Sequence, residues 1–177
     1  MDYSGMNMFL STDNIKRHYE QLKTMKLRFS ILEKSLPQLE GREMGEIMRM
    51  KIDKELKNEA LSLLWNIKSH ELFFLSFTDI QSGSKRILKR FSSKEKFLYD
   101  LLMASFEKEY GFLYIFLNKK DEIVYHFANS FDGAFVKYVP ILALDLYEHT
   151  YFSDYGFDKR RFLTNALAHL NLSSLDN

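Results

Sequence analysis

Cysteine is absent from the 177 residues, and proline occurs only twice. The lack of cysteine excludes disulfide scaffolds, cysteine-ligated zinc, iron–sulfur clusters and thiol nucleophiles. Seven glycines leave little room for a glycine-rich phosphate loop, and the scarcity of proline favours long helices. The 25 Lys and Arg residues nearly balance the 24 Asp and Glu residues, whereas proteins that coat nucleic acid are usually much more basic. We therefore expect no nucleic-acid partner.

Long hydrophobic runs are also missing. No segment approaches the roughly 18 uncharged apolar residues that a membrane-spanning helix needs. The first residues, MDYSGMNMFL, carry an acid at position 2 and lack the basic start of a signal peptide. We expect a cytoplasmic protein with no membrane partner. What is abundant is apolar and aromatic area, at 46% and 15% of residues, enough for a substantial core or a dimer interface.

The first half of the chain, residues 1–81, has the periodicity of a pair of long helices. Apolar residues at helical spacing predict a helix over 13–36, which Pro37 punctuates. A second helical stretch is predicted over 43–77, and its later part has one continuous face. That face comprises Leu63, Ile67, His70, Phe74 and Phe77. Because a short polar loop joins them, the two helices are expected to form an antiparallel hairpin domain.

The second half, residues 82–177, changes period. A basic connection at 82–91 is the expected boundary between two domains, and a helix with Ser92 and Glu95 as its capping box should run to Gly111. The remaining predicted elements are strands at 112–117, 122–127 and 138–147 and a final helix at 159–172. The fold class is therefore α+β, with a three-stranded antiparallel sheet after the helical hairpin.

Three histidines and one aspartate are expected where a core should lie. His18 and His70 are on the apolar faces of the two long helices, and His149 follows Asp145 by four residues at the end of the third strand. Burial of such groups is costly unless they have partners. Each histidine alone is typical of a satisfied core residue, but the four together form a common nitrogen and oxygen ligand set for a first-row transition metal.

The stretch PILALDLYEHTYFSDY at 140–155 resembles the C-terminal metal motif of iron/manganese superoxide dismutases, with Tyr147 in place of a Trp. The segments IKRHYEQL, SHELFFLSF, EYGFLYIFL and FLTNALAHLNL are similar, in order, to further motifs of that family. The resemblance implies that His18, His70, Asp145 and His149 bind one iron or manganese ion per chain.

The resemblance also implies an activity and a partner. Superoxide would be dismuted to dioxygen and hydrogen peroxide at this site between the two halves, and the chain would form a homodimer. Glu148 would bridge to the ligand histidine of the other subunit.

The chain departs from the family pattern around the site. Leu22 and Lys26 stand where the family has a second histidine and a tyrosine, and Asn66 and residues 128–130 stand where it has a glutamine. We expect Asn66 to contact the metal-bound solvent, directly or through a water, and Lys26 to attract a small anion. Side chains that contact the ligands and the bound solvent set the redox potential of the metal. Because these side chains differ here, the sequence does not predict that potential.

Three alternatives follow from these departures: a metal protein with another redox activity, a non-catalytic structural homologue, or a protein of the same fold that binds no metal. The other sequence features are expected to be structural. His126 and His169 have no counterpart in the family, Trp65 should pack between helices, and the basic run at 85–90 is predicted to be a solvated linker.

Overall fold

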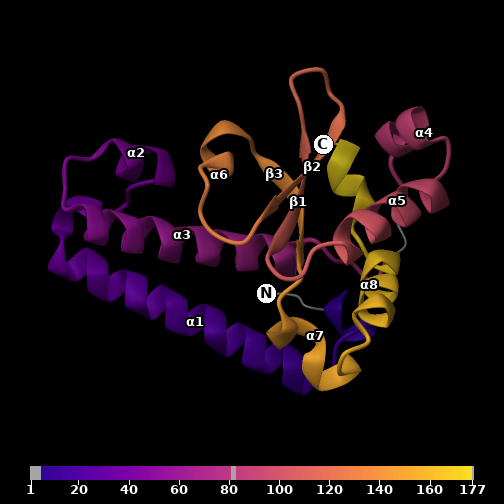
Figure 1. Cartoon of the computed structure of the whole chain (residues 1–177), viewed down its shortest axis with the longest axis horizontal. Helices are drawn as coiled ribbons and strands as arrows, with labels where there is room; N and C mark the ends of the chain where they lie inside the picture. The colour runs from indigo at the N-terminus through magenta and orange to yellow at the C-terminus, as the bar shows by residue number, and fades with distance from the viewer. Residues whose placement is uncertain (1–4, 81–82, 177) are drawn as a thin grey trace.

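The computed structural model describes residues 5–80 and 83–176. A long helical hairpin lies along one side of the molecule, and a small sheet with flanking helices forms the rest (Figure 1). The hairpin contacts the sheet through helix α3, which packs against strand β3. The predicted α+β class, with helices first and a three-stranded antiparallel sheet later, is confirmed. The expected domain boundary at residues 81 and 82 lies outside the described residues.

Helix α1 (Thr12–Ser35) matches the predicted first helix to within one residue at each end. Its start is fixed by Ser11, whose side chain accepts a hydrogen bond from the backbone N–H of Asn14. A short 3₁₀-helix, Met6–Met8, precedes it, and Pro37–Leu39 form another after it. The apolar face of α1 packs against α3.

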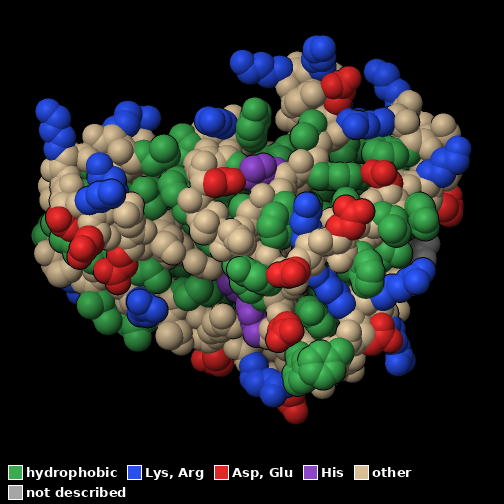
Figure 2. Space-filling view, in the orientation of Figure 1, with side chains coloured by type: hydrophobic (Ala, Val, Ile, Leu, Met, Phe, Trp, Pro, Cys, Tyr) green, Lys and Arg blue, Asp and Glu red, His purple; other side chains and the backbone are tan. Residues whose placement is uncertain are grey.

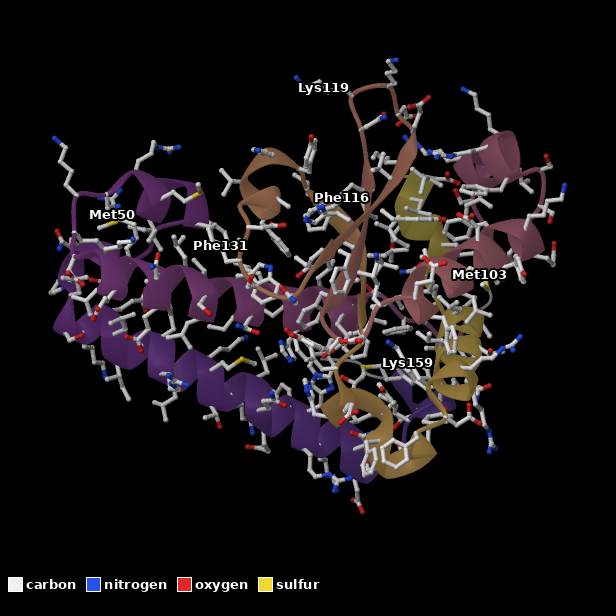
Figure 3. The ribbon with its side chains drawn as sticks, in the orientation of Figure 1. Met50, Met103, Phe116, Lys119, Phe131 and Lys159 are labelled. Carbon is white, nitrogen blue, oxygen red and sulfur yellow. The ribbon has the colours of Figure 1, made fainter. Side chains whose placement is uncertain are left out.

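The prediction of one helix over 43–77 is wrong, because the chain forms α2 (Met44–Arg49) and α3 (Lys54–Leu75). Met50 adopts an extended conformation that ends α2, at the end of the hairpin remote from the sheet (Figure 3). The side chain of Asp53 then caps α3 by accepting hydrogen bonds from the backbone N–H groups of Glu55 and Leu56. Asp53 therefore starts a new helix as its N-cap, although the spacing of apolar residues alone predicted one continuous helix.

The basic segment at 82–91 is not a linker in its described part, since it forms helix α4 (Lys85–Phe91). The next helix, α5 (Lys94–Phe106), is capped by Ser93 and not by the predicted Ser92. Ser92 instead has a left-handed backbone with φ of 66° and closes α4. Helix α5 ends before the predicted stop at Gly111.

Gly111 has a different role, at the start of the sheet. Its φ is 134°, and a Cβ atom there would lie 2.7 Å from the carbonyl oxygen of Ala128. Only glycine fits this close approach of the first strand to the second.

The sheet has the order β2-β1-β3 and is antiparallel throughout. Its strands are β1 (Phe112–Leu117), β2 (Ile123–Ala128) and β3 (Pro140–Asp145). The central strand β1 is buried on both faces, which explains its continuous apolar run FLYIFL. The third strand is shorter than the predicted 138–147, and a short helix that was not predicted, α6 (Ala134–Lys137), precedes it.

The chain after the sheet turns twice. Helix α7 (Glu148–Tyr155) begins three residues after β3, so His149 lies on a helix and not at the end of a strand as expected. Helix α8 (Lys159–Ala168) ends four residues before the predicted 172. It ends there because the backbone that follows forms hydrogen bonds with the residues just after α3. The N–H of Asn171 donates to the backbone carbonyl of Ser76, and the N–H of Thr78 donates to the backbone carbonyl of His169. A 3₁₀-helix, Leu172–Asp176, follows.

None of the helices within the described ranges combines the length and the apolar character needed to cross a membrane.

Ser76 links the two halves of the fold, which gives a test of their packing. Its buried hydroxyl donates to the carbonyl of Leu72 and accepts the backbone N–H of Ala143 in β3, both at 2.7 Å. We predict that Ser76→Ala lowers the free energy of unfolding by about 1–3 kcal/mol, because the Ala143 N–H is left buried without a partner. Urea denaturation followed by circular dichroism measures this loss.

Ser105→Ala is the matched control for this test. Ser105 is equally buried, but its hydroxyl only donates to a carbonyl of its own helix. We expect a loss below about 1 kcal/mol there, since no N–H loses its partner. Equal losses for the two variants would contradict a special role of Ser76 in joining α3 to β3.

Candidate metal centre

Four side chains from four elements meet between the helical hairpin and the sheet. His18 comes from the second turn of α1, His70 from the last turns of α3, Asp145 from the end of β3 and His149 from the first turn of α7. One nitrogen or oxygen atom from each lies within 4.8 Å of the others. The structure therefore brings together all four residues that the sequence suggested as ligands.

The carboxylate of Asp145 is at the middle of this cluster. Its Oδ2 atom lies 3.3 Å from Nε2 of His18, 3.7 Å from Nε2 of His70 and 3.4 Å from Nε2 of His149. The other oxygen, Oδ1, accepts the backbone N–H of Tyr147 at 3.0 Å. One oxygen thus fixes the carboxylate, and the other faces three imidazoles.

The orientation of His70 is set by its own helix. Nδ1 lies 2.8 Å from the carbonyl oxygen of Asn66, one turn earlier. A carbonyl can only accept, so Nδ1 carries the proton and Nε2 presents a lone pair to the centre of the cluster. This is the pairing that commonly fixes the tautomer of metal-bound histidines.

Three of the four groups are sealed from solvent. The side chains of His18 and Asp145 are 0% exposed and that of His70 is 2% exposed, whereas that of His149 is 34% exposed. Both ring nitrogens of His18, Nε2 of His70 and Oδ2 of Asp145 are buried without a hydrogen-bonding partner in the described structure. Such orphaned atoms are costly, and a cation at their centre would satisfy them together. Histidine side chains, from whichever part of the chain, occupy only small areas of the face shown in Figure 2.

The pKa shifts of His70 and Asp145 favour the forms that bind a metal, whereas the shift of His149 favours its protonated form. Burial lowers the pKa of His70 to about 4, so its imidazole is neutral at neutral pH. Burial alone raises the pKa of Asp145, but the neighbouring imidazoles of His149 and His18 outweigh it and hold the pKa below its usual range. For His149, burial lowers the pKa, and the attraction of the Asp145 carboxylate outweighs it, so the net shift is upward. The cluster therefore contains an ionised carboxylate beside imidazole nitrogens.

Aromatic rings surround the cluster. Phe73 stacks on His18 at 5.3 Å between ring centroids, Phe112 contacts His70 edge-on at 5.1 Å, and Tyr147 stacks on His149 at 5.6 Å. These rings exclude water and hold the imidazole planes. The sequence could not reveal these pairings, because each joins residues that are distant along the chain or lie at a corner between elements.

Asn66 does not direct its side chain at the cluster. Its amide donates to the carbonyl of Ser62 at 2.9 Å, and the residue lines a groove between α1 and α3. Its connection to the candidate ligands is the backbone carbonyl that binds His70. The expected contact between the Asn66 side chain and metal-bound solvent stays a prediction.

The other predicted residues lie around the cluster. Lys26 forms an ion pair with Glu71 at 2.7 Å, next to His70 in sequence, and Leu22 is fully buried one turn beyond His18. Glu148 is exposed. His126 is away from the cluster and pairs with Asp132 at 2.6 Å.

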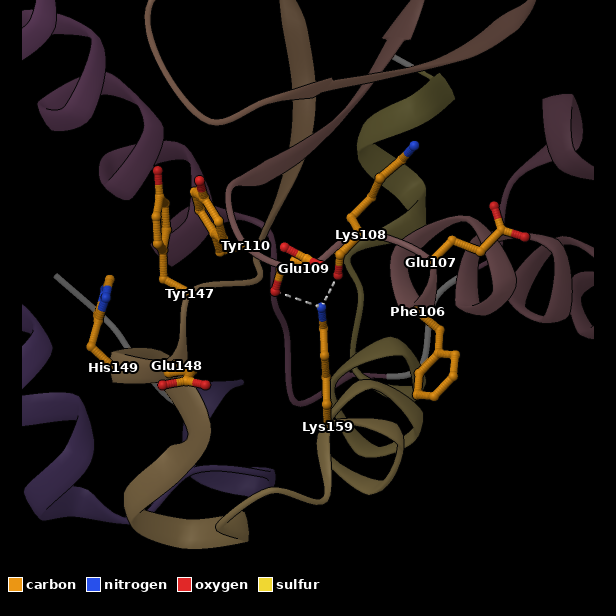
Figure 4. A pocket seen from close by; sticks show the side chains of 9 residues that line it. All are labelled: Phe106, Glu107, Lys108, Glu109, Tyr110, Tyr147, Glu148, His149 and Lys159. Atoms are coloured by element: carbon orange, nitrogen blue, oxygen red, sulfur yellow. Dashed lines mark hydrogen bonds between the residues drawn. The ribbon is translucent and has the colours of Figure 1, made fainter.

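An open cavity of about 800 Å³ borders the cluster on the His149 side (Figure 4). Its lining residues are Phe106, Glu107, Lys108, Glu109, Tyr110, Tyr147, Glu148, His149 and Lys159. Nζ of Lys159 donates to the carbonyls of Lys108 and Glu109, and burial lowers the pKa of this ammonium group. Lys159 had no signal in the sequence, because its place in the cavity depends on the turn between α7 and α8. His149 is the candidate ligand that links the cluster to this cavity.

Two comparisons with known proteins agree with this architecture. The family model for the C-terminal domain of iron/manganese superoxide dismutases matches residues 80–177. The chain is also similar to the chloroplastic iron superoxide dismutase 2 of Oryza sativa subsp. japonica, with 28% identity over 116 residues. That alignment covers 60% of this chain and 44% of the rice protein, so the chain spans less than half of that relative. Since the family match takes in more than half of the chain, this protein belongs to the iron/manganese superoxide dismutase family.

Proposed function

We propose that His18, His70, Asp145 and His149 bind one iron or manganese ion. The observation that carries this proposal is the set of buried, unpartnered nitrogen and oxygen atoms that converge within 4.8 Å. Imidazole and carboxylate donors suit both metals, so the ligand set does not select between them. Three neutral imidazoles and one carboxylate leave a divalent or trivalent ion with positive charge to spare, which favours an anionic substrate.

The proposed reaction is the dismutation of superoxide. Two superoxide anions and two protons give one dioxygen and one hydrogen peroxide, as one superoxide loses an electron and the other gains it. Bound iron or manganese supplies the one-electron redox chemistry. The chain supplies a dry, aromatic surrounding for the ligands, and the cavity beside His149 supplies the approach from solvent.

A second candidate function is metal binding with a different redox activity. It is favoured by the position of Asn66, whose amide bonds to Ser62, and by the pairing of Lys26 with Glu71. Neither side chain then acts on bound solvent or on an incoming anion in the manner expected from the sequence. Side chains around the ligands tune the redox potential of a bound metal. The positions of Asn66 and Lys26 therefore favour a redox potential different from that of a dismutase.

We further propose a homodimer in the cytoplasm. Glu148 is exposed beside His149 at the rim of the cavity, where a carboxylate can reach a second subunit. The similar rice protein is named as chloroplastic, so fractionation of the native cells is needed to locate this chain.

His149 is the candidate ligand that is easiest to remove without loss of folding, because its side chain is the most exposed of the four. His149→Ala should lower bound iron or manganese from about one ion per chain to below about 0.1 and lower dismutase activity at least about 100-fold, because a lost ligand costs more than a lost partner of a ligand. Elemental analysis and a superoxide assay measure the two effects.

His126→Ala is the matched control, since His126 is also partly exposed and paired with an aspartate but lies outside the cluster. It should retain metal and activity. Wild-type protein that holds metal but is no more active than His149→Ala would exclude dismutation and leave the second candidate function. Wild-type protein that takes up neither metal would exclude both.

Asn66→Ala separates a side-chain role from a backbone role. The variant keeps the carbonyl that binds His70, and the amide it removes bonds to Ser62. We expect bound metal and activity within about twofold of wild type. A loss of about 10-fold or more with full metal content would instead show that the amide turns toward bound solvent in the working protein.

Glu148→Ala tests the proposed dimer bridge. We expect the dissociation constant of the dimer in sedimentation velocity to rise at least about 10-fold, because a charged interfacial partner is removed. Glu107→Ala, a change of another acid in the same cavity, should leave it unchanged. A wild-type chain that sediments as a monomer, or equal effects of the two variants, would contradict the bridge.

A further inference from the structure

We propose that Tyr147 is a positioning residue that holds Asp145 and His149 in place as ligands through its backbone, its ring and its hydroxyl. This inference rests on the proposed metal site. Tyr147 lies between the two candidate ligands in sequence, at the corner where β3 ends and α7 begins. It acts on the metal through its neighbours and does not itself offer a ligand.

The backbone of Tyr147 fixes the aspartate. Tyr147 is the N-cap residue of α7 and has an extended conformation, with φ of −68° and ψ of 145°. In this conformation its N–H donates to Oδ1 of Asp145 at 3.0 Å. The bond occupies one carboxylate oxygen and turns the other, Oδ2, toward the three imidazoles.

The ring of Tyr147 restrains the histidine. The two rings are 5.6 Å apart and inclined by 22°, in a stacked arrangement. His149 needs such a restraint more than the other two histidines do. His70 is held by a hydrogen bond from Nδ1 to a carbonyl, and His18 is enclosed between the rings of Phe73 and Phe74.

In contrast, Nδ1 of His149 has no hydrogen-bonding partner in residues 5–80 and 83–176, and its side chain is the most exposed of the four. Figure 4 shows the imidazole at the edge of the cavity, with the ring of Tyr147 beside it and that of Tyr110 on the far side of Tyr147. Within the chain, the stacked phenol ring is thus one constraint on the plane of this imidazole, beside the edge-on ring of His18 at 5.0 Å and the Asp145 carboxylate at 3.4 Å. In the proposed homodimer, Glu148 of the second subunit would add a further constraint.

The hydroxyl of Tyr147 anchors the ring. It donates to the backbone carbonyl of Asn129 at 2.9 Å, in the loop between β2 and α6. Phe112 packs edge-on against the same ring at 5.7 Å. The ring is therefore held at its far end by a loop remote in sequence, and a residue without a hydroxyl could stack but would lack this tether.

The experiment compares Tyr147→Phe, which removes only the hydroxyl, with Tyr147→Leu, which also removes the stacked ring. Each purified chain is loaded with ferric iron, and iron release to excess chelator is timed. We expect release about 3–10-fold faster for Tyr147→Phe and about 10–100-fold faster for Tyr147→Leu, in line with the effect of outer partners on metal affinity. The electron paramagnetic resonance spectrum should change in rhombicity in both variants, because the imidazole plane is freed.

Tyr110→Phe is the matched control, since Tyr110 lines the same cavity and contacts the ring of Tyr147 at 5.9 Å. It should release iron at the wild-type rate with an unchanged spectrum. Thermal unfolding of each apoprotein separates positioning from general stability.

The outcomes distinguish this inference from the proposed function. If wild-type protein holds iron but Tyr147→Phe matches it in release rate and spectrum, the tether is overturned and the metal site stands. A lower melting temperature of the Tyr147 apoproteins with unchanged spectra would mean that the residue only supports the fold, which also overturns positioning. A wild-type chain that holds no iron overturns both proposals.

Discussion

A buried carboxylate oxygen without a hydrogen-bonding partner is the constraint on which the centre of this molecule depends. Oδ2 of Asp145 is sealed from water within the described structure and faces three imidazole nitrogens at 3.3–3.7 Å. A charge in this position is tolerated only when opposite charge or a metal compensates it. The surrounding fold is arranged around that requirement: β3 supplies the aspartate, the two long helices supply one imidazole each, and α7 supplies the third.

The sheet and the hairpin fix these positions with contacts that are themselves buried. Asp145 pairs with Phe112 of the central strand, so the register of the sheet sets how far the carboxylate projects toward the helices. Ser76 joins the end of α3 to β3 and thereby sets the distance of His70 from the sheet. The ligand geometry is thus a consequence of packing between elements that are distant in the chain, such as α3 and β3, and no local segment could form it alone.

This long-range origin explains which features the sequence could predict. Helix α1, the three strands and the four converging side chains were predictable, because apolar periodicity and the ordered motifs of one family mark them. The break between α2 and α3 was not, because Met50 and Asp53 interrupt a pattern that is otherwise helical. The direction of the Asn66 amide was also not predictable. A side chain at that position can turn toward the ligand or toward Ser62, and packing between α1 and α3 decides.

The contacts around the candidate ligands suggest how the ligand set persists while its surroundings change. The carbonyl of Asn66 holds His70 and the N–H of Tyr147 holds Asp145, and both groups belong to the backbone. Backbone contacts survive most substitutions, so replacement of neighbouring side chains leaves His70 and Asp145 in place. Groups that act through side chains have no such protection, as the buried Leu22 and the paired Lys26 illustrate on α1. Metal binding and redox tuning can therefore diverge separately within one fold, since backbone groups hold two of the four ligands whereas redox tuning depends on the surrounding side chains.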